Sequence, residues 1–251
     1  MNLLDRLAAV QERGGRAVLF TVVEGQDAGA KFLIEEGETG VEFAEHADEV
    51  IRGARNTLLE IGDRKVFGEV YMPPPRLFVY GAVDTAEALC RAAKNLGWTK
   101  IVADARRAFA TLERFPSADE LIVEWPKEAL ARVAPDHQTA IIVLTHDAKF
   151  DQPALEGALE TEAFYIGALG SRRNQEKRRA RLIEAGVPEA SLDRIAGPCG
   201  LDIGAESQEE TALSILGEIL AVRAGRPGGF LRDAKRRIHA QEDAPAPSPA
   251  G

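Results

Sequence analysis

The sequence predicts a doubly wound α/β fold with a parallel sheet, preceded by a smaller α/β domain. Three observations carry this prediction. Between residues 76 and 224, short apolar runs alternate with helical patterns, as in chains of strand–helix–strand units. The runs are continuous in valine, isoleucine and leucine, which is typical of strands buried on both faces. A glycine, Gly81, directly follows the first run, as in Rossmann-like domains.

Residues 1–72 are expected to form the small N-terminal α/β domain. The first segment predicts an amphipathic helix that ends at Gly14-Gly15. Its apolar stripe is Leu3, Leu4, Leu7 and Val10. The following segments predict strands at 17–23, 31–34 and 65–71, and a helical stretch at 44–61. The run of prolines at 73–75 is a stiff break and predicts a linker between the domains.

Residues 76–239 are expected to form the C-terminal Rossmann-like domain. Its predicted strands are residues 76–80, 100–103, 120–124, 140–144 and 164–166. Its predicted helices are residues 84–96, 126–133, 153–159, 172–184 and 208–223. The last helix starts with a capping box, in which Ser207 is the N-cap and Glu210 stands three residues later. The Pro/Ala-rich tail, residues 240–251, is expected to be disordered.

Composition restricts the class of protein. Hydrophobic residues make up 45% and charged residues 28% of the 251 residues, which suits a protein with a real core. The net charge of -9 argues against a nucleic-acid partner. The sequence contains neither a membrane-spanning apolar run nor a signal-peptide pattern, so we expect a cytoplasmic protein. Two cysteines are too few for a disulfide framework.

Ligands of such sheets bind beyond the carboxyl ends of the strands, so the candidate residues are those that follow each strand. After the first strand come Gly81, Ala82, Val83 and Asp84. Val83 stands where a second glycine normally lets a pyrophosphate approach the backbone. Asp84 is the predicted N-cap of the next helix, where its carboxylate would repel a phosphate. These residues disfavour a nucleotide in the usual pose.

The loops after the second and fourth strands supply further candidates. Asp104 stands near the ribose-binding position of the dinucleotide fingerprint, and Arg106 follows it as a sugar or phosphate contact. Thr145, His146 and Asp147 leave the fourth strand together. His146 could exchange protons near neutral pH, with Asp147 beside it, so these two are the candidate catalytic residues. An ordinary loop remains an equal alternative.

The loop after the fifth strand predicts an anion site. Gly170 precedes Ser171, Arg172 and Arg173 at a helix start, which combines free N–H groups, a hydroxyl and guanidinium donors. Arg178 and Arg179, further along that helix, are expected on a solvated face. A last glycine-rich loop adds Gly200, Asp202 and Gly204 as binding candidates and Cys199 as a weak candidate for a metal ligand.

Taken in order, these segments resemble the XdhC/CoxI family, the maturation factors of xanthine dehydrogenase and carbon monoxide dehydrogenase. The matching segments are Gly81-Ala82, Asp104-Ala-Arg106, Arg114-Phe-Pro-Ser-Ala-Asp-Glu120, Leu144-Thr-His-Asp147, Tyr165-Ile-Gly-Ala-Leu-Gly-Ser-Arg172, Gly200-Leu-Asp-Ile-Gly-Ala205 and Glu209-Glu-Thr-Ala-Leu-Ser-Ile215. The resemblance implies a carrier rather than an enzyme. Such a carrier binds the molybdenum cofactor, molybdopterin, while sulfur replaces an oxo group, and then delivers it to a molybdenum hydroxylase. A cysteine desulfurase partner and a homodimer are expected with it.

One departure and two alternatives accompany the resemblance. Many family members carry a Gly-Gly-Cys segment in the N-terminal domain, whereas residues 35–42 of this chain contain no cysteine. The first alternative is an NAD(P)-dependent oxidoreductase that uses Asp104 and His146; Val83 and Asp84 disfavour it. The second is a non-catalytic module that docks on a dehydrogenase complex.

Overall fold

The computed structural model describes residues 2–235. They form two compact units, residues 2–73 with 229–235, and residues 74–228. The predicted disordered tail, residues 240–251, lies outside the described residues. No helix among the described residues is both long and apolar enough to cross a membrane.

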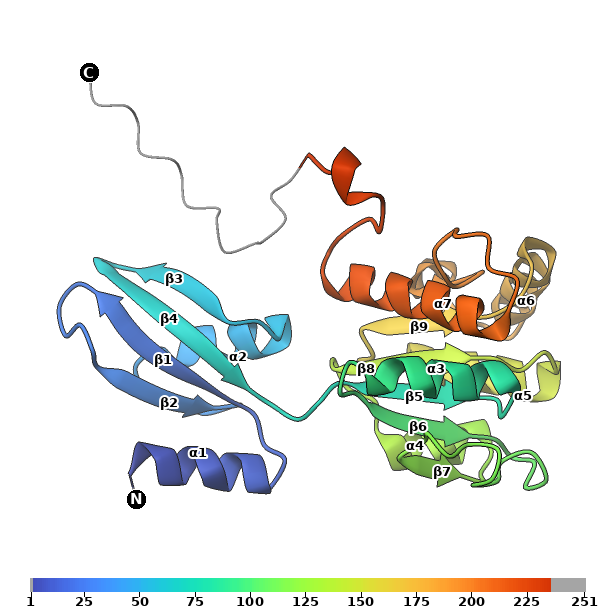
Figure 1. The fold of residues 1–251 in the computed structure, drawn as a ribbon, viewed down its shortest axis with the longest axis horizontal. Helices are drawn as coiled ribbons and strands as arrows, with labels where there is room; N and C mark the ends of the chain where they lie inside the picture. The colour runs from blue at the N-terminus through green and yellow to red at the C-terminus, as the bar shows by residue number, and fades with distance from the viewer. Residues whose placement is uncertain (1, 236–251) are drawn as a thin grey trace. The chain divides into compact units, whose positions relative to one another are not determined.

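The first unit contains a four-stranded antiparallel sheet with the strand order β2-β1-β4-β3 (Figure 1). Its elements are α1 (Leu3–Glu12), β1 (Ala17–Glu24), β2 (Lys31–Glu35), α2 (Ala44–Gly53), β3 (Thr57–Ile61) and β4 (Arg64–Tyr71). Alternate residues of β1 face opposite sides of the sheet. Val18 and Phe20 pack in one cluster with residues of α2, and Leu19 packs in another with α1.

Two expectations for this unit are wrong. The predicted helical stretch 44–61 ends at Gly53, because Ala54 takes a left-handed conformation with φ of 51°, and the rest forms the edge strand β3. The residues of β3 alternate between half-buried and exposed, so the strand has no fully buried face that a sequence pattern could show. Leu4 also lies off the buried stripe of α1: Leu7 and Val10 are buried, whereas Leu4 is 73% exposed.

The second unit contains a six-stranded sheet whose paired strands are all parallel. Its strands are β5 (Arg76–Tyr80), β6 (Thr99–Ala103), β7 (Glu120–Ile122), β8 (Thr139–Val143), β9 (Tyr165–Ala168) and β10 (Ile195–Ala196). Its helices are α3 (Asp84–Lys94), α4 (Pro126–Val133), α5 (Ala148–Leu159), α6 (Arg172–Glu184), the 3-10 helix η1 (Glu189–Arg194) and α7 (Gln208–Arg223). A further 3-10 turn, η2 (Leu231–Asp233), follows in the first unit.

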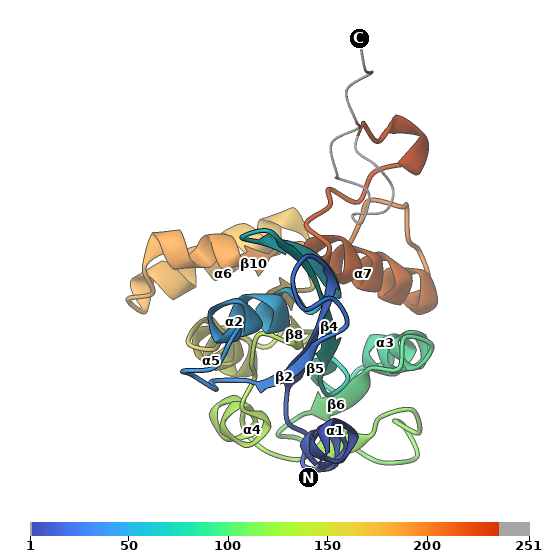
Figure 2. The same cartoon turned by 90° about the vertical axis from the view of Figure 1, so that its left-hand side faces the viewer.

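Helices cover both faces of this sheet. Figure 2 shows α3 and α7 on one side of the sheet and α4, α5 and α6 on the other. The buried residues divide in the same way into two apolar clusters. All five residues of β8 are buried, as expected for a central strand of a parallel sheet. The predicted doubly wound fold is confirmed.

Two details of the second unit differ from the sequence prediction. Helix α5 starts at Ala148 rather than at Pro153, because the Asp147 carboxylate accepts the Lys149 N–H and caps the helix earlier. Pro153 lies inside the helix. The short strand β10 and the 3-10 helix before it carry too few residues for a pattern and were not predicted.

The turn before β8 holds a carboxylate whose ionisation stabilises the second unit. Asp136 accepts hydrogen bonds from the Gln138 N–H and the Thr139 hydroxyl, at 3.0 and 2.8 Å, and pairs with Arg76 at 3.1 Å. Burial alone would raise the pKa of Asp136. The hydrogen bonds and the Arg76 charge outweigh burial and lower this pKa to about 2.

We therefore expect an acid-dependent loss of stability. The lowered pKa of Asp136 contributes fully above about pH 4 and is lost as the pH falls towards 2. Asp136→Asn should cost on the order of 2 kcal/mol at pH 7 and much less near pH 2.5. The measurement is urea unfolding followed by tryptophan fluorescence, since Trp98 and Trp125 both lie in the second unit. Equal losses at both pH values would contradict this, and Glu162→Gln, at an exposed residue, is the control.

Candidate functional site

The predicted site residues gather at one edge of the six-stranded sheet. Numbered by appearance within this unit, the strands stand in the order 3-2-1-4-5-6 from β7 to β10, which is the order of Rossmann domains. The arrowheads of β5, β6, β8 and β9 point the same way in Figure 1. Their following loops therefore meet at the carboxyl edge, and the order reverses between β5 and β8, where ligands of this fold bind.

The turn after β5 is closed by contacts within the protein. Gly81 has φ of 116°, and a Cβ on it would lie 3.0 Å from the Thr145 backbone nitrogen, so the loops after β5 and β8 touch. The N–H of Ala82 donates to Asp104 at 2.9 Å, and that of Val83 donates to the Gly81 carbonyl. Both N–H groups of this turn therefore already have acceptors within the protein.

The prediction that Asp84 caps α3 is wrong. Val83 is the N-cap, without a side-chain hydrogen bond, and Asp84 is the first helical residue. The Asp84 carboxylate is largely exposed and pairs with Arg114 at 2.8 Å. Arg114 also donates to the carbonyl oxygens of Ala82 and Phe109. This arginine, which sequence reasoning did not single out as a site residue, joins the loops after β5 and β6.

Asp104 and Arg106 form an internal ion pair after β6. Asp104 is 2% exposed and accepts from the Arg106 Nε at 2.9 Å, from its Nη2 at 2.8 Å and from its backbone N–H. Burial would raise the pKa of Asp104, but the hydrogen bonds from Arg106 and Ala82 lower it below its usual value. Since Asp104 already accepts four hydrogen bonds, a ribose would have to compete for it.

The three candidate residues after β8, Thr145, His146 and Asp147, differ in their exposure to solvent. Thr145 is buried, and its hydroxyl accepts the Asp147 N–H at 3.3 Å. His146 and Asp147 are exposed, and Asp147 serves as the N-cap of α5. The Asp147 carboxylate is thus engaged in helix capping. The candidate catalytic role of these residues stays a prediction.

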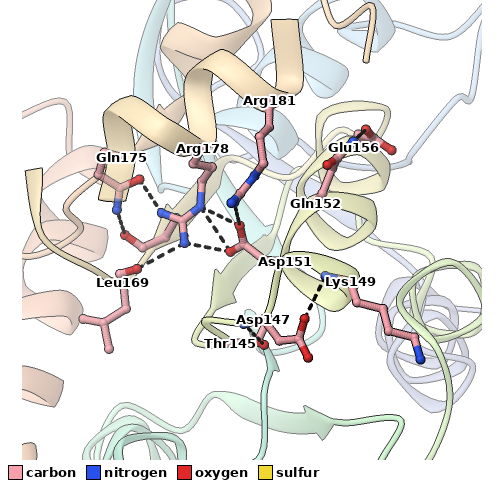
Figure 3. A network of polar contacts seen from close by, with 11 residues as sticks. Thr145, Asp147, Lys149, Asp151, Gln152, Glu156, Leu169, Gln175, Arg178 and Arg181 are labelled. Carbon is pink, nitrogen blue, oxygen red and sulfur yellow. Dashed lines mark hydrogen bonds and ion pairs between the residues drawn. The ribbon is translucent and has the colours of Figure 1, made fainter. Parts of the chain in front are cut away.

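The loop after β9 is held in place by the buried ion pair of Arg178 and Asp151 (Figure 3). Arg178 and Asp151 are 5% and 1% exposed, and the Arg178 Nη2 lies 2.7 Å from Asp151. Arg178 also donates to the Leu169 carbonyl at 3.3 Å, and Gln175 donates to the Ala168 carbonyl at 2.9 Å. The expectation that Arg178 lies on a solvated face is therefore wrong, because its α6 position faces α5.

The start of α6 has the features that the sequence analysis expects of an anion site. Ser171 is the N-cap of α6 and accepts the Asn174 N–H at 3.3 Å. Arg172 and Arg173 are exposed on the first turn, and Gly170 precedes them. The first N–H groups of a helix have no intrahelical acceptor, and the helix dipole favours an anion beside them. Arg179, by contrast, pairs at the surface with Glu189 and Asp193.

The glycine-rich loop after β10 is attached to α7. The N–H of Gly200 donates to Glu218 at 2.7 Å, and Tyr165 donates to the same carboxylate. Asp202 and Gly204 are exposed. Cys199 is buried, and burial first, then the Glu218 charge, raises its pKa to about 12. Among residues 2–235, no group of three His, Cys, Asp or Glu could hold a metal ion.

Fold and edge together define this unit as a Rossmann-type domain in which the turn after β5 is closed by contacts within the protein. The chain belongs to the XdhC family, because the family model of the XdhC Rossmann domain matches residues 77–219, more than half of the chain. The resemblance noted from the sequence is confirmed.

Three relatives illustrate the family. The chain is 35% identical over 151 residues to a probable xanthine dehydrogenase subunit of Bacillus subtilis, covering 60% of this chain and 44% of the relative. It is 31% identical over 153 residues to the molybdenum cofactor insertion chaperone PaoD of Escherichia coli, covering 61% and 42%. A crystal structure of a xanthine dehydrogenase from Bacillus halodurans matches with a TM-score of 0.64 and 26% identity, covering 92% of this chain and 66% of that one. The alignments thus span less than half of either curated relative.

Proposed function

We propose that this protein is a molybdenum cofactor maturation factor that holds the cofactor during sulfuration and supports its insertion into a molybdenum hydroxylase. The helix start at Ser171 and Arg172, beside the reversal point of a Rossmann sheet, carries the proposal. Membership of the XdhC family and the similarity to an insertion chaperone support it. In this role the protein is a carrier and not a catalyst.

The donors at the start of α6 fit the phosphate of the cofactor. Arg172 and Arg173 offer guanidinium groups, and the first N–H groups of α6 point along the helix axis towards an anion. The buried pair of Arg178 with Asp151 holds the loop in place, so little order has to be gained on binding. Gly200, Asp202 and Gly204 border the same edge as further binding candidates. When bound, the cofactor supplies the molybdenum whose oxo group is exchanged.

The sulfur is expected to come from a partner. Both cysteines, Cys90 and Cys199, are buried, and burial is the main cause that raises the pKa of each to about 12. Neither supplies a thiolate at neutral pH. We therefore propose a cysteine desulfurase as the sulfur donor and a molybdenum hydroxylase as the recipient, with a homodimer as the working form. A sedimentation measurement on the purified protein tests the last point.

An NAD(P)-dependent oxidoreductase fits the geometry less well. Its pyrophosphate would need N–H groups that Asp104 and Gly81 already accept from Ala82 and Val83. Titration with NAD and NADP discriminates: micromolar binding of either would favour that alternative. A docking module without a cofactor would bind its dehydrogenase whether or not Arg172 is present.

The decisive variant changes the proposed phosphate contacts. We expect Arg172→Ala with Arg173→Ala to weaken cofactor retention at least tenfold, since each charge-assisted hydrogen bond contributes roughly 1.5–3 kcal/mol. The measurement is cofactor retained after gel filtration, followed by activation of an apo-hydroxylase. Arg179→Ala, on the same helix, is the control and should retain the cofactor. If the unchanged protein neither retains the cofactor nor activates the hydroxylase, the proposal is wrong.

A further inference from the structure

One carboxylate of α7, that of Glu218, holds the glycine-rich loop, residues 197–204, in place. Glu218 is half-buried, and its Oε2 accepts the N–H of Gly200 at 2.7 Å. The same oxygen accepts the hydroxyl of Tyr165, the first residue of β9. A single atom of Glu218 therefore connects the loop, the helix and the sheet. The proposed phosphate contacts at the start of α6 make no use of it.

The Tyr165 hydroxyl acts as a hydrogen-bond donor to Glu218. Burial is the main cause that raises the pKa of Tyr165, and the neighbouring Cys199 and Glu218 raise it further. The phenol therefore keeps its proton at neutral pH and donates a hydrogen bond to Oε2. Since the Gly200 N–H is also a donor, the side chain of residue 218 must supply an oxygen that accepts twice. An apolar side chain there would leave both donors without this acceptor.

The loop also fits closely against the preceding turn of α7. Gly200 has φ of 115°, and a Cβ on it would collide with the Ser214 Oγ. That hydroxyl donates to the Leu201 carbonyl at 2.6 Å, and the Leu201 N–H donates to the Ser214 carbonyl at 3.1 Å. Ser214 and Glu218 stand four residues apart in the sequence, so they lie on the same face of α7. Successive turns of the helix thus bind the loop.

The same loop is joined to the start of α6. The carbonyl of Ala168, the last residue of β9, accepts the Cys199 N–H at 3.2 Å and the Gln175 Nε2 at 2.9 Å. Gln175 belongs to the first turn of α6, and a Cβ on Gly197 would lie 2.5 Å from its Oε1. The loop and this turn therefore share one acceptor and pack against each other. They form two adjoining segments of the carboxyl edge.

We propose that Glu218 is a positioning residue for ligand binding: it holds the glycine-rich loop beside the start of α6, so that both segments contact the cofactor. The inference rests on the proposed function, in which Ser171 and Arg172 take the phosphate. The loop contributes Asp202 and Gly204, which are exposed. Groups that bind a ligand lose affinity when the hydrogen bonds that support them are removed. Glu218 acts only through the loop, because its Oε2 is occupied by two donors of the protein itself.

Two substitutions of Glu218 separate its hydrogen bonds from its packing. Glu218→Gln keeps a carbonyl oxygen whose two lone pairs serve both donors, whereas Glu218→Met keeps the length of the side chain and removes the oxygen acceptor. The measurement is cofactor retained after gel filtration, at a temperature at which circular dichroism shows each variant to be folded. We expect Glu218→Gln to retain the cofactor within about threefold of the unchanged protein. Glu218→Met should retain it roughly tenfold more weakly, which is the effect of one lost hydrogen bond.

Hydrogen exchange followed by mass spectrometry reports how firmly the loop is held without any ligand. In Glu218→Met, the backbone N–H groups of residues 199–204 should exchange roughly tenfold faster than in the unchanged protein, because the loop opens more often. Glu218→Gln should show the exchange rate of the unchanged protein. Strand β8, which is buried throughout, is the internal reference and should keep its rate in both variants.

Glu209→Met, on the same helix, is the matched control. The Glu209 carboxylate is 63% exposed and pairs with Arg91 at 2.8 Å, so its loss should change neither cofactor retention nor exchange in the loop. If Glu218→Met retains the cofactor as tightly as Glu218→Gln, or leaves exchange in the loop unchanged, the positioning role is wrong, while retention by the unchanged protein still supports the proposed function. If the unchanged protein retains no cofactor, the proposed function fails and the positioning role fails with it.

Discussion

Asp151→Ala is expected to lower the free energy of unfolding of the Rossmann-type unit by about 3–5 kcal/mol. The substitution leaves Arg178 as a buried charge that is 5% exposed and has lost its carboxylate partner, and it also removes the contact of Asp151 with Arg181 at 3.2 Å. Replacing a buried charge's partner costs more than the pair itself contributes, because water cannot solvate the remaining charge. The measurement is urea unfolding followed by the fluorescence of the two tryptophans.

Two further variants test whether the loss of stability comes from the buried charge or from the removal of any carboxylate. Asp193→Ala removes a partner of Arg179 at the surface and should leave the free energy of unfolding nearly unchanged. The double variant Asp151→Leu with Arg178→Met replaces both charges by apolar groups and should recover much of the loss. If the double variant is less stable than Asp151→Ala, the buried-charge explanation is wrong.

The same ion pair connects stability to the candidate site. Arg178 donates to the Leu169 carbonyl, one residue before Gly170, so its guanidinium supports the loop that carries Ser171 and Arg172 (Figure 3). We therefore expect loss of Asp151 to weaken anion binding at α6 even at temperatures where the unit remains folded. If loss of Asp151 lowers the stability but leaves anion binding unchanged, the N-cap of α6 alone holds the loop.

Most of the fold could be predicted from the sequence, because buried parallel strands and their helices leave strong patterns. Continuous apolar runs located β5, β6 and β8 within a residue of their observed bounds, and the capping box at Ser207 located α7. The edge strand β3 was missed because its residues are only half-buried, and β10 was missed because two residues cannot impose a pattern. Pairing with neighbouring strands defines both.

Less of the site could be predicted, because sequence shows which residues follow a strand but not which of them contact each other. Ser171 is the N-cap of α6 and Arg172 its first residue, as the pattern predicted, whereas anion binding there stays a prediction. Arg178, judged a surface residue, is buried because an acid 27 positions earlier on α5 faces it. Arg114 was named only within a family segment and not as a site residue, since its role depends on contacts between separate loops.

Gly81→Ala is the second change with a large expected effect, about 2–4 kcal/mol of the free energy of unfolding of the same unit. The residue has φ of 116°, a conformation that side chains disfavour, and a Cβ would lie 3.0 and 3.2 Å from backbone atoms of Thr145 and Leu144. These atoms cannot move away easily, because the Leu144 N–H donates to the Tyr80 carbonyl at 2.9 Å. Relief of the contact must separate the loops after β5 and β8.

Gly186→Ala is the matched control for backbone strain. It has φ of 91°, and no heavy atom that would oppose a Cβ lies within 4 Å in the described structure. Its cost should be limited to the strain itself, about 1–2 kcal/mol. The difference between the costs of Gly81→Ala and Gly186→Ala then measures the close approach of the loops after β5 and β8, where the strand order reverses. Equal costs at the two glycines would mean that the loops after β5 and β8 separate without resistance, and the close approach at Gly81 would then contribute nothing to stability.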